Sequence, residues 1–160
     1  MSDDRLPELG PRGEGWVLLQ LVLFGAIGAC GLLGVYWPNS VESFLVVLGL
    51  VLVAVGLIVF AFGVLALGRS FTPLPRPHPR AEFRQAGIYK HVRHPIYGGV
   101  LVLALGWSFA ESPLALVPTA LLAVLFDLKA RREEAWLVER YPDYGAYRAR
   151  TPWSFVPFLY

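Results

Sequence analysis

Two long runs of apolar residues limit what this chain can fold into. Residues 16–36 form a stretch of 21 residues without a charged side chain, and residues 44–67 form another of 24. A helix needs about 20 residues to cross the hydrocarbon core of a bilayer, which is about 30 Å thick. Both runs are long enough, so the sequence predicts an integral membrane protein.

Two shorter apolar segments follow, at residues 96–110 and 113–126. Each would form about 22 Å of helix, which is compatible with a tight transmembrane hairpin, a re-entrant pair or short helices that extend into water. The intervening Glu111-Ser112-Pro113 favours the hairpin, because serine caps helices and proline suits their first position. The expected fold is all-α, with about four transmembrane helices and a C-terminal hairpin that extends into the cytoplasm.

The basic residues predict the orientation in the membrane. All 14 lysines and arginines lie near the N-terminus, between residues 69 and 93, or between residues 129 and 150, and the two remaining loops contain none. Because basic loops stay in the cytoplasm, we expect both termini and the middle loop on the cytoplasmic side of the inner membrane or an equivalent membrane. The net charge of +2 gives no reason to expect a nucleic-acid partner.

The chain is expected to form one domain of four segments. They are a disordered cytoplasmic N-terminus at 1–15, two transmembrane helices at 16–68, a cytoplasmic connector at 69–95, and at 96–160 the hairpin with a cytoplasmic helix and tail. Four alternating prolines between residues 73 and 79 favour polyproline geometry in the connector. We interpret the connector as a strap or lid over a site, and residues 70–160 as the catalytic part.

Glycines recur at regular intervals in both N-terminal helices. They are Gly25, Gly28, Gly31 and Gly34 in the first, and Gly49, Gly56 and Gly63 in the second. Small residues allow helix backbones to approach closely in lipid. We therefore expect these glycines to pack the first two helices together.

Ionisable residues gather in two clusters next to the shorter apolar segments, at residues 87–97 and 131–134. His94 precedes the turn at 111–112 by about 17 residues, and Glu133 follows it by about 21. At 1.5 Å per residue these spacings correspond to depths of about 26 and 32 Å, so the two clusters should meet at one membrane interface. Ionisable groups against a bilayer usually mark a functional site.

The two clusters carry opposite charge. Arg93 and His94 would stand at a helix N-terminus, where backbone N–H groups favour anions. Glu133 and Glu134 would face them and hold an ammonium group or hydroxyls. A site with one positive and one negative pole suits a zwitterionic ligand, and Gly98 with its neighbouring glycine would let that ligand approach the backbone closely.

Each cluster also has a simpler interpretation. The basic residues can be only the cytoplasmic flank of a helix, Tyr89 and Tyr97 only an interfacial aromatic belt, and the charged run at 131–134 only a solvated helix face. We expect no metal, because no nearby carboxylate completes a ligand set with His91 and His94. Cys30 is the only cysteine, so no thiolate cluster is expected either.

Three motifs follow one another in the C-terminal half. They are Gly87-x-Tyr89-x-x-x-Arg93-His94-Pro95-x-Tyr97-x-Gly99, then Arg132-Glu133-Glu134-x-x-Leu137, then Tyr144-x-x-Tyr147 followed by Pro152 and Pro157. In these residues, and in their order, the chain resembles the isoprenylcysteine carboxyl methyltransferases and the related phospholipid N-methyltransferases. The resemblance covers roughly residues 70–160.

This resemblance implies an integral-membrane enzyme that uses S-adenosylmethionine and releases S-adenosylhomocysteine. The methyl acceptor would be lipidic or small and hydrophobic, for example an isoprenylcysteine-like carboxylate, a phospholipid amine or a thiol, and the bilayer itself would be a partner. The cofactor-binding residues it implies are Tyr89, His94, Pro95, Tyr97, Gly99, Glu133 and Glu134. The catalytic residues it implies are Arg93, Arg132 and Glu133.

An amine acceptor would have to lose a proton, and His91, Glu133 or Glu134 would be candidate bases for it. Two alternative functions stay open from the sequence. One is a sterol-reductase-like membrane enzyme that uses NADPH, although such enzymes are considerably longer. The other is a non-catalytic membrane scaffold or transporter subunit.

Overall fold

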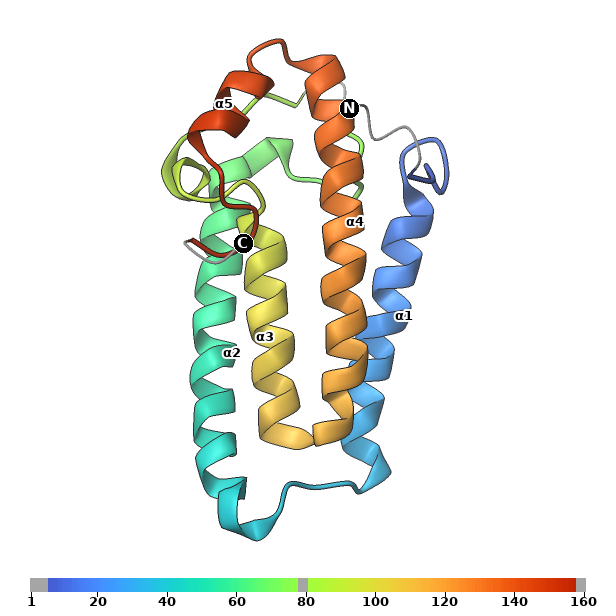
Figure 1. Ribbon diagram of the computed structural model, residues 1–160, viewed down its shortest axis with the longest axis vertical. Coiled ribbons are helices and arrows are strands. Elements are labelled where there is room, and N and C mark those ends of the chain that lie inside the picture. Colours follow the sequence, from blue (N-terminus) through green and yellow to red (C-terminus); the bar gives the residue numbers. More distant parts are fainter. Residues whose placement is uncertain (1–5, 78–80, 158–160) are drawn as a thin grey trace.

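The computed structural model describes residues 6–77 and 81–157, and within these ranges the chain forms helices and no β-strand. Four helices run side by side along the long axis, and a short fifth helix lies at one end (Figure 1). Their bounds are α1 Glu14–Cys30, α2 Asn39–Leu67, α3 Pro95–Glu111, α4 Leu116–Arg140 and α5 Tyr144–Arg150. Short 3-10 turns cover Gly31–Leu33, Gly68–Ser70, Gly87–Lys90 and Pro113–Ala115.

Three of these helices are long and apolar enough to cross a membrane. With their flanking 3-10 turns they extend over Glu14–Leu33, Asn39–Ser70 and Pro113–Arg140. Many of their large apolar side chains point outward: Leu18 of α1 is 63% exposed and Phe44 of α2 is 69% exposed. An outward apolar surface of this kind is suited to lipid. The expected all-α fold with helices able to span a membrane is therefore confirmed.

The turn between α3 and α4 has the predicted chemistry. The Ser112 hydroxyl accepts a hydrogen bond from the Leu114 amide at 3.3 Å and donates one to the Val35 carbonyl at 2.8 Å. It therefore caps the second helix of the hairpin and ties the turn to the loop between α1 and α2. The other ends of the hairpin also agree with the sequence, since α3 begins at Pro95 and α4 ends at Arg140, just before Tyr141-Pro142.

The expected pairing of α1 with α2 through glycines is wrong. Instead, α2 packs along α3, and α1 packs along α4 (Figure 1). A Cβ atom on Gly56 would lie 2.6 Å from the Leu103 amide nitrogen of α3, whereas Gly25 and Gly28 of α1 have no other group within 4 Å. Close approach requires small residues on both helices, and α3 supplies them, because the backbone of Gly99 lies against that of Gly56.

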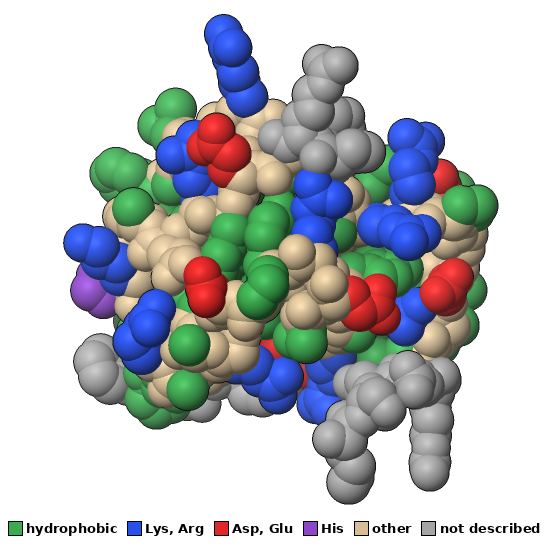
Figure 2. Space-filling view, turned by 90° about the horizontal axis from the view of Figure 1, so that it is seen from above, with side chains coloured by type: hydrophobic (Ala, Val, Ile, Leu, Met, Phe, Trp, Pro, Cys, Tyr) green, Lys and Arg blue, Asp and Glu red, His purple; other side chains and the backbone are tan. Residues whose placement is uncertain are grey.

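The connector lies across the end of the bundle where α2 and α4 end and α1 and α3 begin. Buried Pro75 packs against Gly13, and Arg76 donates to the Pro11 carbonyl at 2.8 Å. Figure 2 looks onto this end and shows Lys and Arg side chains around its rim, with hydrophobic side chains visible between them. The predicted N-terminal, proline-rich and tail segments include residues 1–5, 78–79 and 158–160, which lie outside the described residues.

Candidate functional site

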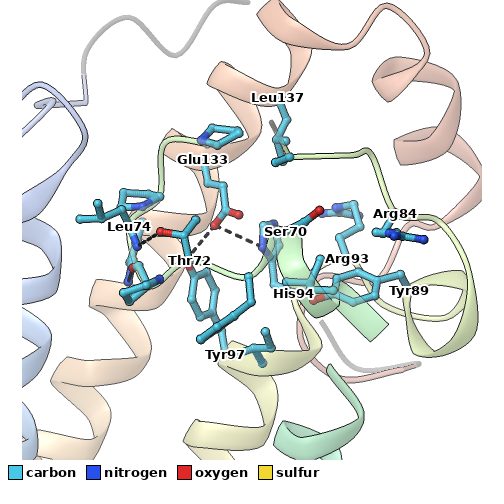
Figure 3. Close-up of a pocket in the computed structure, with 18 of the residues that line it drawn as sticks. Ser70, Thr72, Leu74, Arg84, Tyr89, Arg93, His94, Tyr97, Glu133 and Leu137 are labelled. Carbon is cyan, nitrogen blue, oxygen red and sulfur yellow. Dashed lines mark hydrogen bonds and ion pairs between the residues drawn. The ribbon is translucent and has the colours of Figure 1, made fainter. Parts of the chain in front are cut away.

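A cavity of about 320 Å³ lies under the connector. Its volume falls in the range of about 300–1,000 Å³ that is usual for small-molecule sites. The residues that line it include Gln20, Phe24, Phe60, Tyr89, Arg93, His94, Tyr97, Val100, Phe126, Lys129 and Glu133, together with connector residues 70–75. The two ionisable clusters of the sequence therefore meet at one cavity, as their spacing predicts (Figure 3).

The C-terminal segment fixes the backbone at the start of α3. The Arg93 amide donates to the Trp153 carbonyl at 3.0 Å, and the His94 amide donates to the Ser154 carbonyl at 2.8 Å. His94 has a non-helical backbone (φ −127°, ψ 60°) and immediately precedes Pro95, the first residue of α3. The position of the cluster at 93–94 thus depends on residues sixty positions later in the chain.

Arg93 and Glu134 form a nearly buried ion pair. The Arg93 Nε atom lies 2.7 Å from Glu134 Oε1, and the two side chains are 11% and 9% exposed. Arg93 Nη1 also donates to the Thr151 carbonyl at 2.7 Å and to the Pro152 carbonyl at 2.5 Å. His94 Nε2 lies 3.0 Å from the same carboxylate oxygen. These residues neutralise one another, so they do not form the two open poles that the sequence suggested.

Of the adjacent pair Glu133 and Glu134, Glu133 lines the cavity. Its Oε2 atom accepts a hydrogen bond from the Tyr97 hydroxyl at 2.7 Å and lies 3.8 Å from His94 Nδ1, as the dashed lines in Figure 3 show. Consecutive helical residues point about 100° apart, since a turn contains about 3.6 residues. This rotation sends Glu133 into the cavity and Glu134 into the ion pair with Arg93.

Aromatic rings surround the cavity. The His94 and Tyr97 rings stack with centroids 5.4 Å apart, and the Tyr97 and Phe126 rings stack at 4.8 Å. The Tyr147 hydroxyl donates to the Tyr89 carbonyl at 2.8 Å. Burial raises the pKa of Tyr147 to about 12, and burial followed by the charge of Glu133 raises the pKa of Tyr89 further. Both hydroxyls therefore stay protonated at neutral pH and act as hydrogen-bonding groups rather than as bases.

The two glycines after Pro95 face protein instead of the cavity. A Cβ atom on Gly98 would collide with the Phe155 carbonyl oxygen, and one on Gly99 would lie 2.7 Å from the Phe60 amide nitrogen. Their small size admits the C-terminal segment on one side and α2 on the other, which is a different role from the ligand approach that the sequence suggested. Pro95 is fully buried at the start of α3.

Arg132 stands apart from the cavity. It is 8% exposed, forms an ion pair with Glu8, and lies 4.6 Å from the centroid of the Trp136 ring. The candidate base His91 is exposed and does not line the cavity either. Of the residues implied by the resemblance, the cavity lining contains Tyr89, Arg93, His94, Tyr97 and Glu133, and it does not contain Pro95, Gly99, Arg132 or Glu134.

Sequence reasoning missed Lys129 and Gln20. The Lys129 Nζ atom donates to Gln20 Oε1 of α1 at 2.8 Å and to the Pro73 carbonyl of the connector at 3.1 Å. In the sequence, Lys129 stands out only as one of the basic residues that predict topology. A signal was present, because Lys129 precedes Glu133 by four residues and so shares its helix face.

The chain was compared with known proteins. The model of a protein family described as phospholipid methyltransferase matches residues 44–144. No match was found among curated proteins. The matched range includes most of α2 and all of the connector, α3 and α4, and therefore most of the cavity wall.

Proposed function

This chain belongs to the phospholipid methyltransferase family, and we propose that the cavity under the connector is its active site. Members of the family are membrane enzymes that use S-adenosylmethionine to methylate phospholipid-type acceptors. The observation that carries the proposal is the meeting of residues 89–97 and 129–137 at one cavity. That cavity also lies at the end of the long apolar helices, within reach of both membrane and water.

The residues around the cavity fit S-adenosylmethionine, which supplies a methyl group already activated on a sulfonium. Glu133 offers a carboxylate for a cationic group or for ribose hydroxyls, and the stacked rings of His94 and Tyr97 offer faces that favour positive charge. Phe60 and Phe126 add apolar wall for a base ring. We propose Glu133, Tyr97, His94 and Tyr89 as the cofactor-binding residues.

Arg93 and Glu134 are proposed as positioning residues. Their ion pair holds His94 from one side and residues 151–152 from the other. They would keep the His94 and Tyr97 rings in register with Glu133 without themselves touching the reacting atoms. Arg132, which lies outside the cavity, is proposed to fasten the N-terminal segment through Glu8.

The chemistry needs alignment and a dry site more than it needs acid or base groups. The connector, held by Lys129 through Pro73, would exclude water from the cavity. A carboxylate or thiolate acceptor needs no base. For an amine acceptor, Glu133 is the proposed proton acceptor, because it is the cavity-lining member of the three candidates.

The first test is cofactor binding by Glu133→Gln. Removing the charge while keeping the shape should weaken binding of S-adenosylhomocysteine about 10- to 100-fold, since hydrogen bonds to charged groups contribute about 1.5–3 kcal/mol. The measurement is calorimetric titration of detergent-solubilised protein. Glu139→Gln, an exposed change on the same helix, is the matched control and should bind like the parent.

The same titration tests the function itself. The unmodified protein is expected to bind S-adenosylmethionine and S-adenosylhomocysteine and to give no heat with NADPH. Failure to bind either adenosyl compound would refute the methyltransferase assignment of the cavity. Equal affinities for the parent and Glu133→Gln would remove Glu133 from the site.

We also propose four crossings, with the connector end in the cytoplasm. The support is the packing of α3 along α2 and the arginines and lysines around the connector end (Figure 2). In a Cys30→Ser background, a cysteine replacing Ser40 at the opposite end should react with an impermeant maleimide in intact cells. A cysteine replacing Arg84 should react only after permeabilisation. The reverse pattern would overturn the orientation.

A further inference from the structure

Lys129 is a buried cation in the wall of the cavity. It is 1% exposed, although lysine is rarely buried without a partner. Its ammonium donates to Gln20 and Pro73 and lies 5.1 Å from the centroid of the Tyr97 ring and 5.8 Å from that of Phe126. Every one of these contacts is with a neutral group.

No carboxylate among the described residues lies within 4 Å of the Lys129 ammonium. Glu133, one helical turn away, acts on Lys129 through its charge without direct contact, and its carboxylate accepts a hydrogen bond from the Tyr97 hydroxyl. An ammonium has three N–H donors, and two of them have acceptors in the described part of the chain. A buried charge without a counter-ion in direct contact is costly, so an anion that reached the Lys129 ammonium in the cavity would account for keeping a lysine here.

The location of Lys129 indicates which ligand would bring that anion. Four residues along α4 correspond to about 6 Å, and Lys129 is nearer than Glu133 to the turn with α3, and thus to the middle of the bundle. The cavity lining on that part of the helices includes Phe24, Phe60 and Val100. Glu133 and His94 lie nearer the ends that the connector covers. A lipid would enter from the apolar part, with its polar head at Lys129.

We propose that Lys129 binds the anionic group of the methyl acceptor, a phosphodiester or a carboxylate carried by a lipid chain. This inference rests on the proposed function of the cavity. Lys129 and Glu133 then form the two open poles of the site, and Gln20 orients the lysine from α1. Gln20 lies outside the residues that the family model matches, so this contact would belong to acceptor specificity rather than to the shared cofactor site.

The unmodified protein provides the first test. Saturated with S-adenosylhomocysteine, it should bind dioctanoyl phosphatidylethanolamine at least about tenfold more tightly than the phosphate-free amine with the same two acyl chains, because a hydrogen-bonded charge pair is lost with the phosphate. Calorimetry in detergent measures both. Equal affinity for the two lipids would exclude a phosphodiester as the anion, and it would overturn the proposal if the S-farnesylated cysteine carboxylate described below were also insensitive to Lys129→Gln. Saturation with S-adenosylhomocysteine verifies independently that the cofactor site is intact.

Lys129→Gln removes the charge but keeps a donor for Gln20 and Pro73. It should weaken binding of the phospholipid about tenfold or more, leave the affinity for S-adenosylhomocysteine unchanged, and leave binding of dodecanethiol unchanged. Lys129→Arg should restore part of the phospholipid affinity. Lys90→Gln, which alters the other lysine of the chain at an exposed position, is the matched control.

The two sources of the anion are separated by repeating the comparison with an S-farnesylated cysteine derivative. If Lys129→Gln weakened binding of this carboxylate ligand alone, Lys129 would be assigned to a carboxylate acceptor. If it weakened binding of the phospholipid alone, Lys129 would be assigned to a phosphodiester. Two results overturn the proposal. One is an equal loss for phospholipid and dodecanethiol, which would mean a packing role. The other is a loss confined to S-adenosylhomocysteine, which would mean that Lys129 holds the cofactor carboxylate.

Discussion

Arg93→Ala is expected to abolish measurable methyl transfer and to lower the free energy of unfolding by about 3–5 kcal/mol, the usual cost of leaving one member of a buried ion pair alone. The change leaves the Glu134 carboxylate nearly buried with only His94 and the more distant Arg148 beside it. It also removes the donors to the carbonyls of residues 151 and 152. Only the backbone hydrogen bonds from residues 93 and 94 would then hold the C-terminal segment to the start of α3, and the cavity wall would loosen.

Arg148→Ala is the matched control for this prediction. Arg148 contacts the same carboxylate at 3.5 Å, but its side chain is 58% exposed. Exposed pairs contribute about 1 kcal/mol or less, so the free energy of unfolding and the cofactor affinity of this variant should remain close to those of the parent. Arg93→Lys keeps the charge but not the forked geometry of the guanidinium. Its losses of stability and of cofactor affinity should therefore lie between those of Arg93→Ala and Arg148→Ala. Unfolding in mixed micelles and titration with S-adenosylhomocysteine measure these effects, and similar losses for Arg93→Ala and Arg148→Ala would contradict the assigned role.

The second large effect is expected at Gly56. Even alanine there would place its Cβ atom 2.6 Å from the Leu103 amide nitrogen and 2.7 Å from the Gly99 carbonyl oxygen. Both neighbours are backbone atoms, which cannot move aside as a flexible side chain can. Overpacking of this kind costs about 1–3 kcal/mol, and Gly56→Leu should exceed this and prevent α2 from packing on α3.

Gly28→Ala tests whether the loss of stability at Gly56 comes from the close contact of α2 with α3 rather than from replacing a helical glycine by alanine. Gly28 lies in α1 with no other group within 4 Å of an added Cβ atom. Because alanine favours helix by about 1 kcal/mol over glycine, this variant should be as stable as the parent or more so. Thermal unfolding in detergent compares the two. If Gly56→Ala were as stable as Gly28→Ala, the close contact of α2 and α3 would be refuted.

The helix boundaries could be predicted because their signals are local. Pro95 begins α3, Ser112 caps the turn, and Tyr141-Pro142 ends α4, each through its own backbone chemistry. The meeting of the two ionisable clusters was also predictable, since it required only the length of a helix on either side of one turn. These features do not depend on which helix is the neighbour.

Helix pairing and side-chain direction could not be predicted in the same way. The glycines of α1 and α2 carry the same signal, but only those of α2 face a helix with glycines of its own. Glu133 and Glu134 are adjacent and chemically alike, and the choice between them depends on where Arg93 and Tyr97 lie in three dimensions. Lys129 resembled a topology marker because its partners, Gln20 and Pro73, come from distant parts of the chain.

The backbone hydrogen bonds from residues 93 and 94 to residues 153 and 154 have a consequence for biosynthesis. The helices α1, α2 and α3 end more than 40 residues before the segment that fixes Arg93 and His94, so they can enter the membrane before that segment has been made. The nascent protein would therefore be inserted but unable to form its cavity wall until translation has passed residue 154. A nascent chain that ends before residue 153 would lack the contacts that hold the start of α3 in place.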